Sequence, residues 1–201
     1  MSSTRVLVIR HGQSTWNAAG RWQGHADAPL TDLGRAQAAG AVAGLPAVEA
    51  IWASDLERAR STADIIAAAL ELPVRVDDRF RERNAGDWTG LTREEIEVGW
   101  PRYLAERRRP AGFEHDEDVL ARVIDGLGDV HDTHPGRQVL IVTHGGVLRA
   151  MERHCHDVDQ PFPNLGGRFF TIGGEDGAIT ISAGRRLFPL AADQATFTTA
   201  P

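Results

Sequence analysis

The sequence predicts an α/β fold: a three-layer α/β/α sandwich around a mostly parallel central sheet of about six strands, with one antiparallel edge strand. Two observations carry this prediction. Short runs of β-branched and other apolar residues alternate with longer segments whose apolar residues recur at helical spacing. The clearest runs, Val6–Ile9 and Val139–Val142, contain no polar residue, as expected of strands that are buried on both faces.

The other elements of the first half follow in chain order. A long loop after the first strand precedes Asp32–Gly44, which is rich in alanine and predicts a helix. Ala50–Ser54 is a second strand, and it leads into a helix over Leu56–Leu70 that a proline terminates. Val74–Val76 is a third strand. These alternating elements extend the α/β pattern.

The second half begins with an irregular stretch and returns to regular structure. The predicted helices are Arg93–Val98, Arg102–Arg107, Asp116–Val130 and one after Val142, and Phe169–Ile172 and Ile179–Ile181 form an edge hairpin. The residues from about 190 to 201 predict a poorly ordered tail. Since neither a repeat nor a linker interrupts the pattern, residues 1–201 are predicted to form one domain.

The composition bounds the function. The chain has 201 residues, 42% of them hydrophobic and 25% charged, as in ordinary globular proteins. The net charge of −6 argues against nucleic acid as a partner. One cysteine, no long apolar run and no secretory signal indicate a cytoplasmic protein without a membrane partner. Arginines gather beside the motifs described next, which favours a small anionic ligand.

Two histidines stand just past the ends of the two clearest strands. His11 lies between Arg10 and Gly12, and His144 is followed by Gly145 and a second glycine. Parallel sheets bind ligands at the carboxyl ends of their strands. Glycine lets backbone N–H groups approach an anion, and a helix N-terminus favours negative charge. The two motifs together predict a phosphate site.

Two further segments have a weaker signal. Arg58 and Arg60 lie in the first turns of a predicted helix, where the helix dipole disfavours a cation unless an anion is bound. Glu82 stands between Arg81 and Arg83. Taken singly, these residues are typical of solvated helix surfaces and surface ion pairs.

Together the four segments resemble the histidine phosphatase superfamily, also called the phosphoglycerate mutase-like proteins, from about Arg5 to Arg149. The resemblance implies a metal-independent phosphatase that acts on a small phosphate monoester, with no cofactor. It implies a phosphorylated histidine at His11 and a proton donor at Glu82, and it gives Arg60 no role in the phosphate pocket. The implied catalytic residues are His11, Glu82, His144, Arg10 and Arg58, and the implied substrate-binding residues are Arg10, Asn17, Gln23, Gly24, Arg58, Glu82, Arg93, His144 and Gly145.

The chemistry sets expectations for these side chains. Arg10, Arg58 and a protonated His144 would neutralise a phosphate dianion. His11 must attack as a neutral ring, whose other nitrogen donates to a backbone carbonyl. Glu82 would protonate the leaving alkoxide and later deprotonate water. Neither the pair His131 and His134 nor the pair His154 and His156 has a full ligand set at zinc spacing, so no metal site is predicted.

Alternatives to a phosphatase remain open. A cofactor (2,3-bisphosphoglycerate)-dependent phosphoglycerate mutase would share the catalytic residues, but mutases have an asparagine where this chain has Gly146 and a tyrosine where it has Ala85. Conversely, Arg93 matches a mutase lysine that binds carboxylate, and Arg107–Arg109 is similar to the arginines of the mutase lid. The phosphatase substrate is therefore expected to be a phosphoglycerate derivative or a sugar phosphate. A remote alternative is a non-catalytic phosphoprotein-binding module, and both monomer and homodimer are open.

Overall fold

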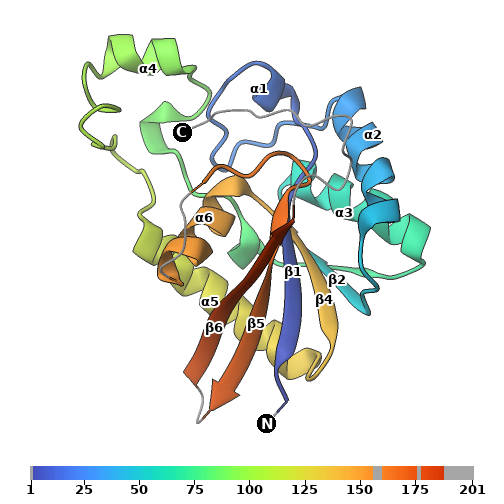
Figure 1. The fold of residues 1–201 in the computed structure, drawn as a ribbon. Coiled ribbons are helices and arrows are strands. Elements are labelled where there is room, and N and C mark those ends of the chain that lie inside the picture. Colours follow the sequence, from blue (N-terminus) through green and yellow to red (C-terminus); the bar gives the residue numbers. More distant parts are fainter. Residues whose placement is uncertain (1, 156–159, 176–177, 188–201) are drawn as a thin grey trace.

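A computed structural model describes residues 2–155, 160–175 and 178–187, and its centre is a six-stranded sheet (Figure 1). The spatial order of the strands is β3-β2-β4-β1-β5-β6. β1 to β4 run parallel, while β5 is antiparallel to both of its neighbours, β1 and β6. The strands are β1 (Thr4–Arg10), β2 (Ala50–Ala53), β3 (Val74–Val76), β4 (Gln138–Thr143), β5 (Gly167–Glu175) and β6 (Ala178–Leu187). The predicted, mostly parallel sheet is confirmed.

The helices largely follow the predicted pattern. They are α1 (Thr15–Ala18), α2 (Asp32–Ala41), α3 (Glu57–Leu70), α4 (Arg93–Gly99), α5 (Asp116–Thr133) and α6 (Gly145–His154), with single 3-10 turns at Val42–Gly44, Asp78–Phe80 and Gly86–Trp88. The helix predicted over Arg102–Arg107 is wrong, because residues 101–107 form turns. Arg102 and Arg107 have φ angles of 69° and 55°, which a right-handed helix does not admit. The tail predicted after about residue 190 lies outside the described residues.

Both faces of the sheet are apolar, as the uninterrupted strand runs predict. Successive residues of a strand point to opposite faces. Val6 and Val8 of β1 pack with side chains of α5 and α6, while Leu7 and Ile9 pack with side chains of α2 and α3. Figure 1 shows these helix pairs on opposite sides of the sheet. The three-layer α/β/α sandwich is therefore confirmed.

A third, smaller core lies outside the sandwich. Trp88, Ile96 and Phe113 are buried together, and the partly buried Trp22 packs against them. The rings of Trp22 and Trp88 meet edge to face with centroids 5.2 Å apart. This aromatic cluster holds the segment from 88 to 113 against the loop that follows β1.

The strand register brings the two histidine motifs together. Arg10 at the end of β1 pairs with Thr143 at the end of β4. His11 directly follows Arg10, and His144 directly follows Thr143. Both histidines therefore leave the sheet at neighbouring points of the same edge. β2 adjoins β4 on its other side, and the segment with Arg58 follows it. One edge of the sheet thus carries three of the four motifs.

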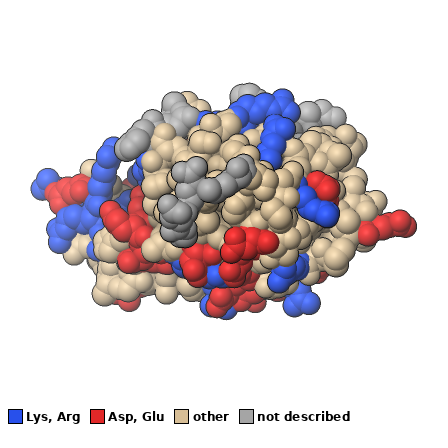
Figure 2. All heavy atoms as spheres, turned by 90° about the horizontal axis from the view of Figure 1, so that it is seen from below, with Lys and Arg blue, Asp and Glu red and all other residues tan. Residues whose placement is uncertain are grey.

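Figure 2 shows the molecule from below, the end from which β1 starts in Figure 1. Acidic and basic side chains are interspersed there among uncharged ones, and acidic groups gather near the middle. The described residues on this face form no broad basic surface of the kind that binds polyanions. Within the described residues, no helix combines the length and the apolar character needed to cross a membrane.

Candidate active site

His11 lies at the end of β1 and is 2% exposed. Its Nδ1 donates a hydrogen bond of 2.6 Å to the carbonyl of Gly12. This bond fixes the tautomer and leaves the lone pair on Nε2. Burial lowers the pKa of His11 well below its usual value, and the charges of Arg58 and Arg10 lower it further. His11 is therefore a neutral, oriented imidazole near pH 7.

His144 caps the start of α6 and packs against His11. The two rings meet edge to face with centroids 5.1 Å apart. His144 is fully buried, and neither ring nitrogen has a hydrogen-bond partner among the described residues. Burial lowers its pKa well below the usual value, and the charge of Arg58 lowers it further. The ring is therefore neutral near pH 7 when no anion is bound, and a protonated His144 beside a phosphate dianion stays a prediction.

Two buried guanidinium groups bring positive charge close to His11. Arg10 donates from Nη1 to the carbonyl of Phe162 across 2.7 Å. Arg58 donates to the carbonyls of Ala26 and Gly24 across 2.8 and 2.9 Å. Burial lowers the pKa of each arginine to about 10, partly offset by the charge of Glu82. Both groups therefore remain charged at neutral pH.

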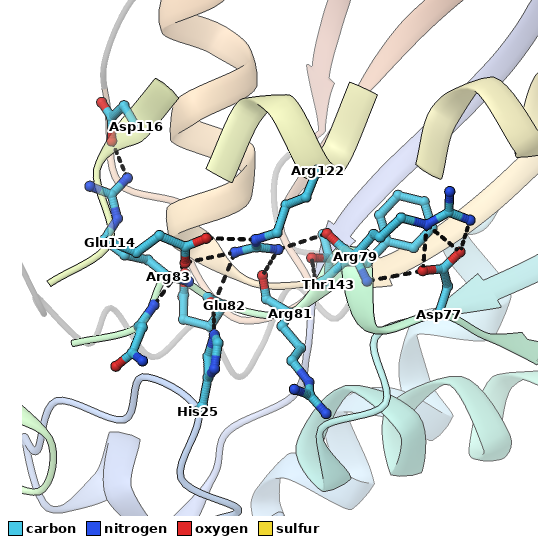
Figure 3. A network of polar contacts seen from close by, with 12 residues as sticks. His25, Asp77, Arg79, Arg81, Glu82, Arg83, Glu114, Asp116, Arg122 and Thr143 are labelled. Carbon is cyan, nitrogen blue, oxygen red and sulfur yellow. Dashed lines mark hydrogen bonds and ion pairs between the residues drawn. The ribbon is translucent and has the colours of Figure 1, made fainter. Parts of the chain in front are cut away.

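Glu82 faces the N-terminus of α6. Its Oε2 accepts a hydrogen bond of 3.2 Å from the N–H of Gly146, and its Oε1 accepts one of 2.8 Å from the N–H of Arg83. A Cβ atom at position 146 would overlap Oε1, so the glycine makes room for the carboxylate. Figure 3 shows Glu82 within a network of arginines and carboxylates.

A cavity of about 70 Å³ opens at this place. Its lining includes most of the predicted site residues: Arg10, His11, Asn17, Gln23, Gly24 and Glu82, together with Arg21, Trp22, Arg83, Ala85, Phe113, Gly146 and Arg149. At about 10–15 Å³ for each water-sized group, this volume fits about five heavy atoms, as in a phosphate group. Arg58 and His144 are fully buried and outside the lining, but they contact the lining residues Gly24 and His11, respectively.

Three further residues predicted to bind the substrate, Asn17, Gln23 and Gly24, lie in the segment that follows β1. Asn17 Oδ1 accepts a hydrogen bond of 3.2 Å from the N–H of Ser14, so its amide nitrogen remains for a ligand or a neighbour. Gln23 Oε1 accepts one of 2.7 Å from the Ser14 hydroxyl. Gly24 has a φ of 51°, where a side chain would meet the backbone of Ala85. Sterics and hydrogen bonds therefore shape this wall.

Three predicted or weighed residues stand apart from the cavity. Arg93 is about half exposed and pairs with Glu97 across 3.0 Å. Gly145 is not part of the lining, and a Cβ atom at this position would lie 3.7 Å from the Arg10 side chain. Arg60 is mostly exposed and lies 3.8 Å from Asp64, in agreement with its expected place outside the pocket.

A wider cleft of about 410 Å³ adjoins the cavity and shares four lining residues with it: Trp22, Arg83, Phe113 and Arg149. Six arginines line the cleft: Arg83, Arg93, Arg107, Arg109, Arg149 and Arg153. Among the described residues, Asp116 is the one carboxylate in the lining, and it pairs with Arg83 and Arg153. The cleft is therefore strongly basic.

The sequence pattern did not reveal Asn164. This residue is 1% exposed, and its Nδ2 donates to the carbonyl of His11 across 2.9 Å and to Oδ1 of Asn17 across 3.4 Å. It lies in an irregular loop between Pro163 and a pair of glycines, where no periodic signal marks it. The irregular pattern of that loop was the one feature of the sequence that could have indicated a site residue there.

The histidines weighed as metal ligands lie elsewhere. His131 Nδ1 hydrogen-bonds the Thr4 hydroxyl across 2.9 Å, and His156 lies outside the described residues. Within residues 2–155, 160–175 and 178–187, no three His, Cys, Asp or Glu side chains form a group that could hold a metal.

Comparisons with known proteins agree with this site. Residues 6–166 match the model of the histidine phosphatase superfamily (branch 1). The chain is 37% identical to a metal-independent phosphoserine phosphatase of Arabidopsis thaliana, over 74% of this chain and 67% of that protein. It is also 37% identical to a glucosyl-3-phosphoglycerate phosphatase of Mycobacterium tuberculosis, over 75% of this chain and 74% of that protein.

A solved structure shows the same fold. A mycobacterial glucosyl-3-phosphoglycerate phosphatase in complex with VO3 superposes with a TM-score of 0.79 at 31% identity, over 89% of this chain and 96% of that chain. The chain belongs to branch 1 of the histidine phosphatase superfamily and is a metal-independent hydrolase of phosphate monoesters.

Proposed function

We propose that the chain hydrolyses its substrate in two steps through a phosphohistidine on His11. The observation that carries the proposal is the bond from His11 Nδ1 to the Gly12 carbonyl in a ring that burial keeps neutral. In the first step Nε2 bonds to phosphorus, and the ester oxygen leaves with the bonding electrons. Water then attacks the phosphohistidine, the N–P bond breaks, and His11 returns to its neutral form.

Arg10, Arg58 and His144 are proposed to hold the phosphoryl group. At an effective dielectric constant of about 20, each close cation attracts a unit charge by roughly 4 kcal/mol before desolvation is counted. Arg10 lines the cavity, and Arg58 lies buried next to it. The unpartnered ring nitrogens of His144 supply a hydrogen bond to a phosphoryl oxygen. Such stabilisation of charge dominates the catalysis of phosphoryl transfer.

Glu82 is proposed as the proton carrier of both steps. Its carboxyl gives a proton to the leaving alkoxide when the P–O bond breaks, and its carboxylate then takes a proton from the attacking water. The place of Glu82 in the cavity lining, opposite the start of α6, supports this role. The two transfers return the group to its starting state, so the cycle balances.

The substrate is proposed to carry a second anionic group, as a phosphoglycerate derivative does; a sugar phosphate is the simpler alternative. The basic cleft beside the cavity favours the former, because a ligand longer than a phosphate must enter it. The substrates named for the two phosphatase relatives are phosphate esters that also carry a carboxylate. Asn17 would contact the phosphate in the cavity, and Arg93 would contact the second anionic group in the cleft.

The substrate proposal has its own test. Hydrolysis of 3-phosphoglycerate and of glucose 6-phosphate is compared in the wild type and in Arg93→Ala. Loss of the carboxylate contact should lower the ratio of the two kcat/KM values by about tenfold, as expected for one exposed ion pair to a ligand. An unchanged ratio would remove Arg93 from the proposed substrate site.

The decisive experiment uses p-nitrophenyl phosphate in excess chelator. Wild type should release nitrophenolate and, after acid-free quenching, carry phosphate on His11, while His11→Ala should do neither. A phosphoprotein-binding module would release no nitrophenolate. A mutase would release little and would interconvert 2- and 3-phosphoglycerate once primed with the bisphosphate. Labelled phosphate on any residue other than His11 would overturn the mechanism.

The partners and the cellular compartment are proposed from the composition of the chain. The acidic net charge speaks against nucleic acid as a partner, and a single cysteine fits a reducing compartment such as the cytoplasm. We propose that the whole of residues 1–201 forms one domain and acts as a monomer or homodimer.

A further inference from the structure

The segment that carries Glu82 has no strand partner. Residues 81–84 follow a 3-10 turn and belong to no helix or strand. Even so, the four consecutive carbonyls from 79 to 82 all accept hydrogen bonds from side chains. The Thr143 hydroxyl binds the carbonyl of Phe80 across 2.7 Å. Side chains from other elements therefore fix this backbone.

One guanidinium binds the other three carbonyls. Arg122 on α5 donates from Nη1 to the carbonyls of Arg79 and Arg81, both across 2.7 Å, and from Nη2 to the carbonyl of Glu82 across 3.2 Å. Figure 3 shows this side chain at the centre of the network, between Glu82 and Arg79. The three bonds determine the path of the backbone on both sides of Glu82.

Arg122 is itself held in place by Glu114. Nε donates to Oε1 of Glu114 across 2.7 Å, and Nη2 donates to Oε2 across 3.0 Å. Oε2 also accepts from the N–H of Asn84 across 2.9 Å, so the carboxylate reaches the same segment. All five guanidinium N–H groups of Arg122 thus have an acceptor. Lysine has three donors and no planar fork, so it cannot reproduce this arrangement.

The network leaves the Glu82 side chain free to face the cavity. The Glu82 carbonyl is bound by Arg122 and by His25 Nε2, the latter across 2.7 Å. Within the part of the chain that the structure describes, the carboxylate accepts hydrogen bonds from backbone donors alone, the N–H groups of Arg83 and Gly146. The arginine contacts the peptide and not the carboxylate, so no ion pair with Arg122 competes with proton transfer by Glu82.

We propose that Arg122 is a positioning residue for proton transfer, holding the backbone of Glu82 so that its carboxyl meets the leaving oxygen. The proposal rests on the role proposed above for Glu82 as proton carrier. A displacement of about 1 Å in a group at the reacting centre costs about a hundredfold in rate. Loss of the hydrogen bonds from Arg122 should therefore slow the step that needs the proton and leave the rates of the other steps unchanged.

Two substrates with different leaving groups distinguish a positioning role of Arg122 from a purely structural role. In glycerol 1-phosphate the glycerol must leave as an alkoxide and needs a proton, whereas p-nitrophenolate is a stable anion that leaves without one. The experiment measures kcat/KM for both substrates, because this constant reports the steps up to formation of the phosphohistidine. The proteins are wild type, Glu82→Gln, Arg122→Lys and the control Arg79→Lys.

Glu82→Gln should lose at least about a hundredfold with glycerol 1-phosphate and less than about threefold with p-nitrophenyl phosphate. Arg122→Lys should show the same selectivity, with at least about a tenfold loss on glycerol 1-phosphate. Arg79 joins the same segment to Asp125 and Asp129 on α5, but its side chain does not touch Glu82. Arg79→Lys should therefore change both substrates by the same small factor.

Equal losses on the two substrates in Arg122→Lys would overturn the proposal and leave a structural role. If Arg122→Lys does not fold, as judged by thermal unfolding, Glu114→Gln decides, because it weakens the support of Arg122 and should give a smaller loss with the same selectivity. If Glu82→Gln itself shows no selectivity, the proposed role of Glu82 fails and the proposal for Arg122 fails with it. Activity in His11→Ala would instead overturn the phosphohistidine mechanism.

Discussion

The backbone N–H of Gly146 donates to Oε2 of Glu82 across 3.2 Å, and position 146 has no side chain that would occupy the space of this carboxylate. Gly146 is the second residue of α6, and His144 is the cap of the same helix. The proposed proton carrier and the pocket histidine are thus joined through one helical turn. A change in this turn affects both groups together.

Gly146→Ala should lower kcat/KM for an alkyl phosphate by about a hundredfold or more, because the new Cβ would overlap Oε1 of Glu82. Overpacking of a filled site also costs about 1–3 kcal/mol of stability. Steady-state kinetics and urea unfolding measure the two effects. The comparison is Gly145→Ala, whose Cβ would make only ordinary contacts, at 3.7 Å from Arg10. A loss in Gly145→Ala as large as in Gly146→Ala would refute the steric explanation.

Asn164→Ala should weaken both stability and activity, because the carbonyl of His11 loses its donor inside the protein. An unsatisfied buried acceptor costs about 1–3 kcal/mol. The amount of phosphohistidine formed per enzyme in a rapid-quench experiment tests the effect on His11, and denaturant unfolding tests the effect on stability. Asn164→Asp keeps the shape but removes the donor, so it should resemble the alanine variant. Full phosphorylation at the wild-type rate in both variants would contradict this role.

Much of the site was predictable because strand ends in a parallel sheet share one edge. Arg10, His11 and His144 follow strands whose apolar runs are plain in the sequence, and the register then makes them neighbours. Asn164 and Arg122 were not predictable in this way. Both act through backbone carbonyls of other segments, and nothing in a sequence shows which carbonyls lack a partner.

The errors have physical causes as well. The turns at 101–107 contain good helix formers, but Arg102 and Arg107 adopt left-handed backbone angles, and tertiary packing of Tyr103 and Leu104 on the Trp88 cluster outweighs the local propensity. The lowered pKa of His144 was not predictable, because sequence does not reveal full burial next to Arg58. Burial and cation charge act in the same direction, so the ring stays neutral.

Glu152→Ala should destabilise the fold more than other ion-pair variants. Glu152 is fully buried and accepts from Arg168 across 2.7 Å and from Arg186 across 2.5 Å. Removing one member of a buried ion pair leaves charge without a partner and costs about 3–5 kcal/mol. The matched control is Asp64→Ala, since the pair of Asp64 with Arg60 is exposed and contributes little. Guanidinium unfolding curves check the difference, and equal midpoints for the two variants would contradict it.

Stability should fall as the pH drops below about 6.5, because burial lowers the pKa values of both His11 and His144 below the 6.5 of an unfolded histidine. Below that pH the unfolded chain binds protons that the folded chain does not, so the free energy of unfolding falls. Each group contributes up to about 1.4 kcal/mol per pH unit. His134, whose pKa is also lowered by burial, acts in the same direction.

The carboxylates with lowered pKa values do not contribute to the change of stability between pH 5 and 7.5. The hydrogen bond from Arg81 lowers the pKa of Asp55. Burial raises the pKa of Glu114, but the hydrogen bonds from Arg122 and the N–H of Asn84 outweigh it, so this pKa is lowered as well. The contribution of both carboxylates to stability is therefore complete above the unfolded values of 3.8 and 4.5 and is lost only below them. Urea unfolding at several pH values between 5 and 7.5 should therefore give a steep slope in the wild type. The double variant His11→Gln, His144→Gln removes both titrating rings and should flatten that slope. A slope that stays unchanged in the double variant would mean that these imidazoles titrate normally, and the neutral nucleophile would lose its physical basis.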